Sequence, residues 1–251
     1  MRLVCSTACF PEDRIETAVS KAGWAGYAGV ELYLPEEPFP DVEAMRARLR
    51  AEELELAAVR TGPLPRVAEG PEWEAALAAI GRAASYAREL DSALLITEAP
   101  FEGTPEAVAA GLRLLDRALG ALPVDVCLVN RAGTVAADPG ALAEILRAAG
   151  RRRFGIALDP GQALLAGWDP LELEALPELP RCVYLNDALR GRVVPPGEGE
   201  LDLPLFGERL RLAGYDGPVC LRLENADPWA VDPLVKELAE AAAGWLGIPP
   251  R

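Results

Sequence analysis

Short apolar stretches with a two-residue alternation recur along the chain and are separated by longer stretches with helical spacing. The short stretches predict eight β-strands, over residues 2–7, 29–33, 55–60, 93–98, 124–129, 154–159, 182–187 and 218–224. The longer ones predict helices over residues 13–22, 41–53, 72–89, 105–120, 138–149 and 231–245. The helix after the sixth strand is the least clearly indicated. Strands that alternate with helices in this way predict an α/β fold, a single (β/α)8 TIM barrel.

The domain organisation follows from length and composition. The chain has 251 residues, which is within the usual size of one such barrel, and its composition shows no break that would mark a linker. The segments AGYAGVEL (25–32) and AGYDGPVCL (213–221) repeat one pattern of helix end, turn and strand start. We therefore expect one domain over residues 1–251.

Charge and hydropathy restrict the partners. The formal net charge of -14 repels phosphate backbones, so we expect no nucleic-acid partner. The N-terminal residues MRLVCSTACF lack the apolar run of a secretory signal, and no stretch of about 18 apolar residues could cross a bilayer. We expect no membrane association and a cytoplasmic location, and the sequence leaves a homo-oligomer open.

Histidine and cysteine usage narrows the chemistry. The chain has no histidine, which excludes Ser-His-Asp and Cys-His constellations and every histidine-ligated metal site. Its five cysteines form no CxxC pair and lie mostly in apolar strands, so we expect neither a disulfide nor a thiolate metal site. Any catalysis must use carboxylates, Arg, Lys, Tyr or Cys.

An ordered series of motifs spans the whole chain: STACF, GYAGVEL, DPGQALLAG, VYLNDA and PPGEGELDLPLFGERLRLAGYDGPVCLRL. In this order the chain resembles the xylose isomerase-like TIM barrels. These include sugar isomerases and epimerases, inosose dehydratases and endonuclease IV-type enzymes. The resemblance implies a barrel that takes a small sugar or polyol-like molecule at the C-terminal ends of its strands.

The resemblance also implies a metal site, which can be compared position by position. Its sugar epimerases bind one divalent cation through Glu, Asp, His and Glu at the ends of strands five to eight. The matching positions here are Val129, Asp159, Tyr184 and Arg222. Valine has no donor atom and arginine does not deprotonate to coordinate, so we expect no metal and no cofactor. The same substitutions remove two glutamates that serve those epimerases as acid and base.

Strand alternation turns charged side chains toward the barrel interior and nominates Glu31, Asp159 and Arg222 as catalytic candidates. We predict that the Arg222 guanidinium replaces the cation by pairing with Asp159 and Glu31, while the Tyr184 hydroxyl binds a remaining acceptor. The alternatives are a purely structural Glu31, an Asp159 that only caps the following turn, and an Arg222 extended into water.

Further polar and aromatic residues at strand ends are candidates for substrate binding: Tyr33, Asn130, Gln162, Trp168, Tyr184, Asp187 and Glu224. The rings of Tyr33 and Trp168 could stack on a sugar, although such rings often only pack. Arg60 and Glu98 extend the polar rim. We interpret the acidic loop 197–200 as part of this rim, not as a phosphate site. Any pocket is expected at the C-terminal face.

Three classes of function remain. We favour a protein that has lost the divalent-metal site and binds or acts on a sugar or polyol-like molecule without metal. If it is active, the resemblance implies isomerase or epimerase chemistry. The alternatives are a non-catalytic barrel with a structural or regulatory role, and a metal-dependent isomerase or epimerase with unusual ligands.

Overall fold

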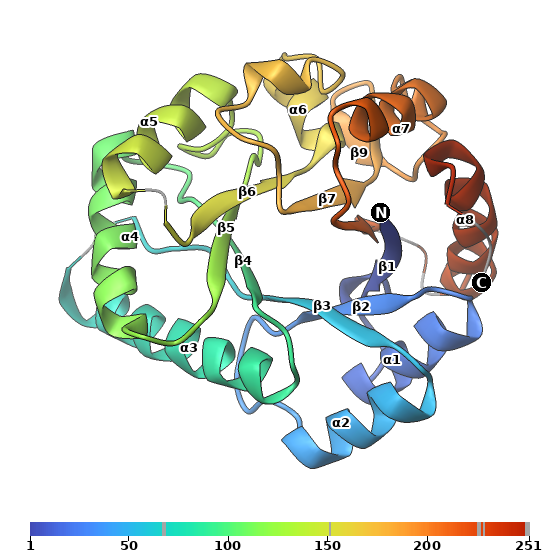
Figure 1. The fold of residues 1–251 in the computed structure, drawn as a ribbon, viewed down its shortest axis with the longest axis horizontal. Coiled ribbons are helices and arrows are strands. Elements are labelled where there is room, and N and C mark those ends of the chain that lie inside the picture. The colour runs from blue at the N-terminus through green and yellow to red at the C-terminus, as the bar shows by residue number, and fades with distance from the viewer. Residues whose placement is uncertain (67–68, 151, 225–226, 228, 249–251) are drawn as a thin grey trace.

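Eight parallel strands form a closed barrel in the computed structural model, which describes residues 1–66, 69–150, 152–224, 227 and 229–248 (Figure 1). Their hydrogen-bonded order is β1-β10-β7-β6-β5-β4-β3-β2. The strands are β1 (Arg2–Ser6), β2 (Gly29–Tyr33), β3 (Glu55–Arg60), β4 (Leu94–Glu98), β5 (Asp125–Val129), β6 (Phe154–Leu158), β7 (Cys182–Leu185) and β10 (Pro218–Leu221). The predicted TIM barrel is confirmed. The last two strands end earlier than the apolar pattern indicated, at Leu185 and Leu221.

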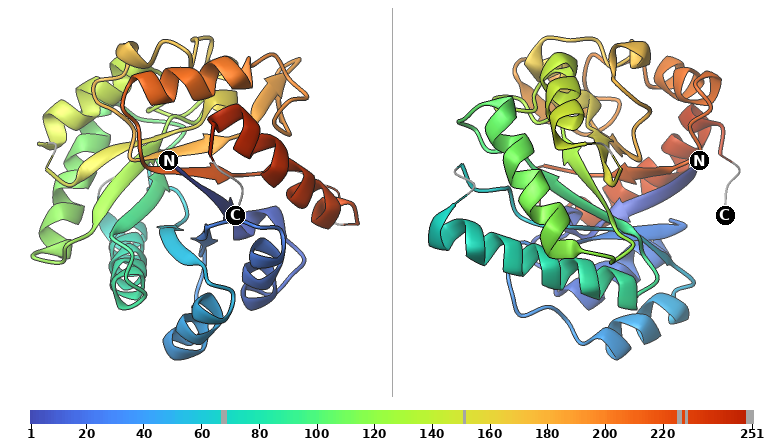
Figure 2. Two further views of the ribbon diagram at one scale, coloured as in Figure 1. Left: turned by 45° about the vertical axis from the view of Figure 1, so that its right-hand side comes forward. Right: turned by 60° about the vertical axis from the view of Figure 1, so that its left-hand side comes forward.

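Helices surround the barrel and cover the outer face of its strands (Figures 1 and 2). They are α1 (Ile15–Trp24), α2 (Val42–Ala51), α3 (Gly70–Glu89), α4 (Pro105–Leu119), α5 (Pro139–Ala149), α6 (Pro160–Ala166), α7 (Leu203–Leu212) and α8 (Val231–Leu246). Two short 3-10 helices, η1 (Thr7–Cys9) and η2 (Leu173–Ala175), lie in the connections. Among the helices of the described residues, none is both long and apolar enough to cross a membrane.

Aspartates and a threonine begin several of these helices. The side chains of Asp41, Thr104, Asp138, Asp159 and Asp202 each accept a hydrogen bond from the backbone N–H three residues later. In four of the five cases a proline in the first turn supplies a backbone angle suited to a helix start. Helix α6 ends after two turns at Gly167, in the left-handed conformation. It is therefore shorter than the other α-helices of the described chain, which explains its weak sequence signal.

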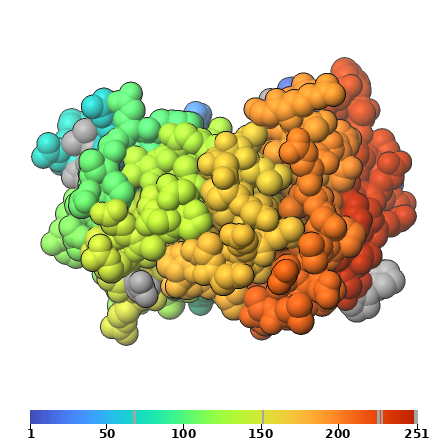
Figure 3. All heavy atoms as spheres, turned by 90° about the horizontal axis from the view of Figure 1, so that it is seen from above, coloured from blue at the N-terminus to red at the C-terminus, as the bar shows by residue number. Residues whose placement is uncertain are grey.

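A small hairpin follows β7 and was not predicted. The chain leaves the barrel at Asn186, and β8 (Asp187–Leu189) then pairs antiparallel with β9 (Arg192–Val194). The two turn residues, Arg190 and Gly191, have φ values of 50° and 78°, as a tight hairpin turn requires. The hairpin packs against α6. In Figure 3 the segments coloured from yellow-green to orange, which include α5, α6 and α7, form a continuous surface on that side of the barrel.

The core has two parts. A large apolar cluster fills the space between strands and helices. Inside the barrel lies a smaller cluster of mostly small side chains: Val4, Ala57, Ala58, Ile96, Cys127, Val129, Ala157, Cys182, Tyr184 and Cys220. All five cysteines of the chain are free and buried. Tyr184 is the largest side chain of the inner cluster, and charged residues lie beyond it, at the C-terminal ends of the strands.

Candidate functional site

Charged side chains meet at the C-terminal end of the barrel and are almost completely buried. Two arginines and three acids in this layer are at most 6% exposed: Glu31, Arg60, Glu98, Asp159 and Arg222. We call this set the polar layer. Charged residues are rarely buried to this extent unless they are paired, so their contacts decide what the layer can do.

Arg222 pairs with two carboxylates at once. Its Nη1 lies 3.3 Å from Asp159 Oδ2, and its Nη2 lies 2.7 Å from Glu224 Oε1. The predicted pair with Asp159 is confirmed, and the alternative of an Arg222 in bulk water is excluded by its burial. The predicted pair between Arg222 and Glu31 is wrong.

The strand order explains this difference. Glu31 is on β2, which is separated from β10 by β1. The nearer hydroxyl of Ser6 on β1 donates to Glu31 Oε1 at 2.7 Å. The second oxygen, Oε2, accepts a hydrogen bond from Tyr184. Glu31 is thus satisfied by two hydroxyl groups instead of a guanidinium.

Tyr184 occupies the position where the resemblance places a histidine, and two arginines approach its ring. The guanidinium carbons of Arg60 and Arg222 are 5.6 and 5.4 Å from the ring centre, within the range of cation–π attraction. Burial and the nearby charge of Glu31 raise the pKa of Tyr184 well above its ordinary value. The phenol therefore stays protonated at neutral pH and acts as a hydrogen-bond donor.

A second charged group lies on the other side of the polar layer. Arg60 forms an ion pair with Glu98, and Arg131 Nη1 approaches the two oxygens of the same carboxylate at 3.1 and 3.2 Å. Burial by itself would raise the pKa of Glu98, but the guanidiniums of Arg60, Arg131 and Arg222 outweigh it and the net shift is downward. Glu98 is thus held in its charged form.

Asp159 is in a different electrostatic state. Burial raises its pKa, and the opposing effects of Arg222 and of the Gln162 backbone N–H do not fully compensate. Its Oδ1 accepts the hydrogen bond from Gln162 N at 2.9 Å that begins α6. Asp159 therefore does serve as a cap, as one alternative expected, and it pairs with Arg222 through its other oxygen.

Two of the predicted substrate-binding residues, Asn130 and Asp187, form hydrogen bonds to the backbone with their side chains. The Asn130 amide donates to Asp159 O at 2.9 Å and accepts from Asp159 N at 2.6 Å, which joins the ends of β5 and β6. The Asp187 carboxylate accepts hydrogen bonds from the backbone N–H groups of Ala188, Gly199 and Leu201, at 2.8, 3.1 and 3.0 Å. Both contacts give these residues a structural role, and a role in substrate binding stays a prediction.

The two residues predicted to stack on a sugar, Trp168 and Tyr33, also have contacts within the protein. Trp168 Nε1 donates to Ala137 O at 3.0 Å, and the partly buried ring packs against the apolar core. The Tyr33 ring lies 5.4 Å from the Arg60 guanidinium carbon. Neither residue lines any pocket described below.

A pocket of about 710 Å³ opens at the C-terminal end of the barrel, and we call it the mouth pocket. Two predicted residues, Gln162 and Glu224, line it. The rest of its wall is formed by Phe101, Arg131, Ala132, Leu165, Arg192, Val193, Val194, Pro195 and Glu198. The volume is typical of sites for small molecules. The hairpin and the following loop form one side of this pocket, and Glu198 is the residue of the predicted acidic loop 197–200 that lines it.

Sequence reasoning missed Phe101 and Arg131. The Phe101 side chain is 61% exposed, and its ring centre lies 5.7 Å from the Arg131 guanidinium carbon. A signal was present, because both residues closely follow strands that end in the polar layer. An aromatic residue within the polar segment EAPFEG is the kind of exposed ring that binds ligands.

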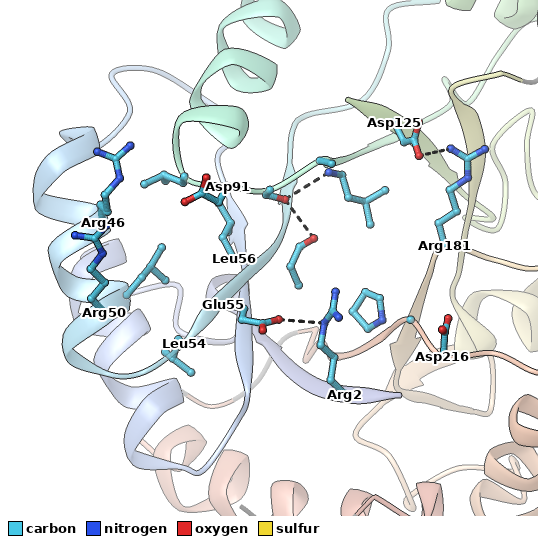
Figure 4. Close-up of a pocket in the computed structure, with 18 residues that line it drawn as sticks. Arg2, Arg46, Arg50, Leu54, Glu55, Leu56, Asp91, Asp125, Arg181 and Asp216 are labelled. Atoms are coloured by element: carbon cyan, nitrogen blue, oxygen red, sulfur yellow. Dashed lines mark hydrogen bonds and ion pairs between the residues drawn. The ribbon is translucent and has the colours of Figure 1, made fainter. Parts of the chain in front are cut away.

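A pocket of similar size, about 780 Å³, lies at the N-terminal end of the barrel (Figure 4). Exposed and partly exposed ion pairs surround it, including Arg181 with Asp125 at 2.7 Å and Arg2 with Glu55 at 3.5 Å. The expectation that any pocket would lie at the C-terminal face is therefore wrong for this one. The charged first residues of three strands, Arg2, Glu55 and Asp125, line this pocket, and it contains none of the predicted site residues.

The residues present do not fit the divalent cation that the resemblance implies. Val129 is buried and supplies no donor, and Arg222 places a positive charge beside Asp159. Within the described ranges, no three His, Cys, Asp or Glu side chains are grouped so that they could hold a metal ion. The local chemistry favours the Arg222 guanidinium over a divalent metal cation at this position.

Comparison with solved structures shows the fold that this site is built on. A D-psicose 3-epimerase with D-tagatose, from Clostridium cellulolyticum H10, superposes with a TM-score of 0.80 at 16% identity, covering 98% of this chain and 99% of that one. A xylose isomerase domain protein from Alicyclobacillus acidocaldarius subsp. acidocaldarius gives 0.76 at 20% identity, with 98% and 99% covered. A probable 3-DHS dehydratase from Bacillus anthracis gives 0.78 at 16% identity, with 95% and 98% covered.

The search of curated proteins found no match to this chain. The structural similarities, all at low identity, establish the barrel but not an activity. A family model, in contrast, matches residues 19–247, which is most of the sequence. The chain therefore belongs to the xylose isomerase-like TIM barrel family.

Proposed function

We propose that this protein binds a sugar or polyol-like small molecule in the mouth pocket without a divalent cation. One observation carries the proposal: Arg222, which stands where the resemblance implies a metal ligand, bridges Asp159 and Glu224 with its guanidinium. The Arg222 guanidinium is permanently charged and supplies the positive charge that a metal ion would otherwise bring. Glu224 and Gln162 extend from this bridge to the pocket wall, where hydroxyl groups of a ligand could reach them.

If the protein is an enzyme, its reaction is an isomerisation or epimerisation on a sugar-type substrate, with Glu31, Asp159 and Arg222 as the proposed catalytic groups. Burial raises the pKa of Asp159, which favours its protonated form and suits a carboxyl that exchanges a proton with a substrate. Other expectations from the sequence stay part of the proposal: a cytoplasmic location, no nucleic-acid partner, no cofactor and an open oligomeric state.

A second candidate is a non-catalytic barrel with a structural or regulatory role. Burial favours it, because the carboxylates of Glu31 and Asp159 are at most 1% exposed and are already bonded to neighbouring side chains or backbone. A substrate could reach them only if Arg222 or Tyr184 moved. The third candidate, a metal-dependent isomerase with unusual ligands, has the weakest support, because the donor set is incomplete.

Thermal melting and metal analysis test these candidates together. We expect protein purified without chelators to contain less than stoichiometric metal, and Mn²⁺, Co²⁺ or Zn²⁺ to leave its melting temperature unchanged. Some member of a panel of sugars, sugar acids and polyols should raise that temperature, since a ligand that binds the native state stabilises it. A tightly held, saturable metal would support the metal-dependent candidate. A panel without any effect would contradict ligand binding and support the non-catalytic candidate.

A further inference from the structure

The Arg131 guanidinium has an unused side that is available to a ligand. Its Nη1 contacts both oxygens of Glu98. Within the described chain, its Nε and Nη2 form no hydrogen bond or ion pair. The side chain is 33% exposed and lines the mouth pocket. The Nε and Nη2 groups of an arginine form a planar fork that matches the two oxygens of a carboxylate.

The partner of Arg131 does not neutralise it completely. Glu98 is shared with Arg60, so two guanidiniums contact one carboxylate. Arg60 is only 4% exposed and cannot exchange Glu98 for water. The positive charge of the partly exposed Arg131 is therefore only partly compensated and can attract an anionic ligand in the pocket.

Phe101 holds this guanidinium in place. The ring centre lies 5.7 Å from the guanidinium carbon, and together with Glu98 it restricts the arginine from two sides. Preorganisation of this kind lowers the entropy lost when a ligand binds. The exposed ring also gives the pocket an apolar face against which a carbon skeleton can lie.

Acceptors for hydroxyl groups line the same pocket. The side chain of Glu224 is 21% exposed and has a partner in Arg222, and Glu198 lies on the loop after the hairpin. Gln162 accepts from Ala132 N through its Oε1 at 3.0 Å, which leaves its amide N–H₂ for Glu224 and the pocket. The mouth pocket thus combines the Arg131 guanidinium with two carboxylate acceptors, Glu224 and Glu198, and with the Gln162 amide as a donor.

Resting on the proposed function, we infer that the ligand is a polyhydroxylated carboxylic acid whose carboxylate pairs with the free Nε and Nη2 groups of Arg131. Its hydroxyl groups donate to Glu224 and Glu198. A pocket of about 710 Å³ accepts a molecule of this size.

A carboxylate suits the pocket better than a phosphate monoester. The phosphate carries a charge of about -1.5 to -2 at neutral pH, against -1 for a carboxylate. Two glutamates line the pocket, and the whole chain has a net charge of -14. The repulsion on a phosphate is therefore larger than the repulsion on a carboxylate.

Matched ligand pairs test the inference by titration calorimetry. Aldonates of four to six carbons are compared with alditols of the same configuration, which replace the carboxylate with a hydroxymethyl group. Phosphorylated alditols form a third arm. We expect an aldonate to bind roughly 10- to 100-fold more tightly than its alditol, as charged hydrogen bonds generally provide. Arg131→Gln should remove this difference, and Arg131→Lys, which keeps the charge without the fork, should restore part of it.

Arg113→Gln is the matched control, because Arg113 is exposed on α4 and contacts Ala148 O away from the pocket. It should leave the preference for aldonates unchanged. Equal affinities for aldonates and alditols would overturn the inference but leave the proposed function standing. Tighter binding of phosphorylated alditols would overturn the assignment of a carboxylate. If no ligand of any arm binds to correctly folded protein, both the inference and the proposed function fail.

Discussion

The Tyr184 hydroxyl donates a hydrogen bond to Glu31, and this contact connects β7 with β2 across the interior of the barrel. Both side chains are at most 1% exposed. The guanidiniums of Arg60 and Arg222 also lie within cation–π distance of the Tyr184 ring. Buried groups bonded in this way give the site stiffness as well as charge.

Tyr184→Phe should destabilise the fold by about 1–3 kcal/mol, because it leaves a buried carboxylate oxygen without its donor. The free energy of unfolding from urea titration measures the effect. Tyr33→Phe is the control, since no hydrogen bond of the Tyr33 hydroxyl is formed within the described chain. Equal stabilities of Tyr184→Phe and wild type would show that the hydroxyl contributes nothing.

Arg222→Ala should cost about 3–5 kcal/mol at neutral pH, because Asp159 and Glu224 lose the cation between them. Asp159 already has a raised pKa, and removal of the guanidinium raises it further. Protonation relieves the unpaired charge, so the deficit relative to wild type should shrink as the pH falls from 8 to 5. Urea titrations at both pH values provide the measurement. A deficit that grows toward pH 5 would contradict the assigned contacts.

Glu98 contributes stability with the opposite pH dependence. Its pKa in the folded protein is lowered, so its contribution is complete above the ordinary glutamate pKa of about 4.3 and is lost as the pH falls toward the folded value. The stability difference between wild type and Glu98→Gln should therefore be largest near neutral pH and decrease below about pH 4.3. Unfolding free energies from pH 3 to 7 test this, and a difference that is constant over the range would argue against the ion pairs.

Gly199→Ala should destabilise the loop beside the hairpin. A Cβ at this position would overlap the Asp187 carboxylate, which binds the backbone of the same loop. Such overpacking typically costs about 1–3 kcal/mol. Gly244→Ala is a suitable control, because nothing lies near the Cβ that it would add. Melting temperatures of both variants give the comparison, and an unaffected Gly199→Ala would mean that the loop is not held by Asp187.

Restoring the implied donors should create a metal site. In the triple variant Val129→Glu, Tyr184→His and Arg222→Glu, two oxygen donors and one nitrogen donor join Asp159. We expect Mn²⁺ or Co²⁺ to raise its melting temperature and to leave wild type unchanged. Circular dichroism first checks that the variant folds. A folded triple variant with no response to metal would show that the four positions do not converge as the resemblance implies.

Much of the candidate site could be predicted from the order of residues. The alternation within each strand turned Glu31, Asp159, Tyr184 and Arg222 inward, and all four are buried. The partners of these residues could not be predicted in full. Arg222 pairs with Glu224, close in sequence, while Glu31 bonds to a serine on the neighbouring strand. The two-residue periodicity specifies on which face of a strand a side chain lies. It does not specify the distances between side chains, which decide whether two charged groups form an ion pair.

The sequence by itself determined the barrel. The spacing of apolar residues specifies which faces of the strands and helices the hydrophobic effect buries, and this spacing can be read from one sequence. It also excluded histidine chemistry and supplied no donor at Val129. Only the tertiary structure decided that Arg131 and Phe101 share a pocket, that Asn130 and Asp187 hold the backbone, and that a second hollow opens at the opposite end. These are contacts between residues distant along the chain, and their geometry depends on barrel closure and on the packing of every strand between them.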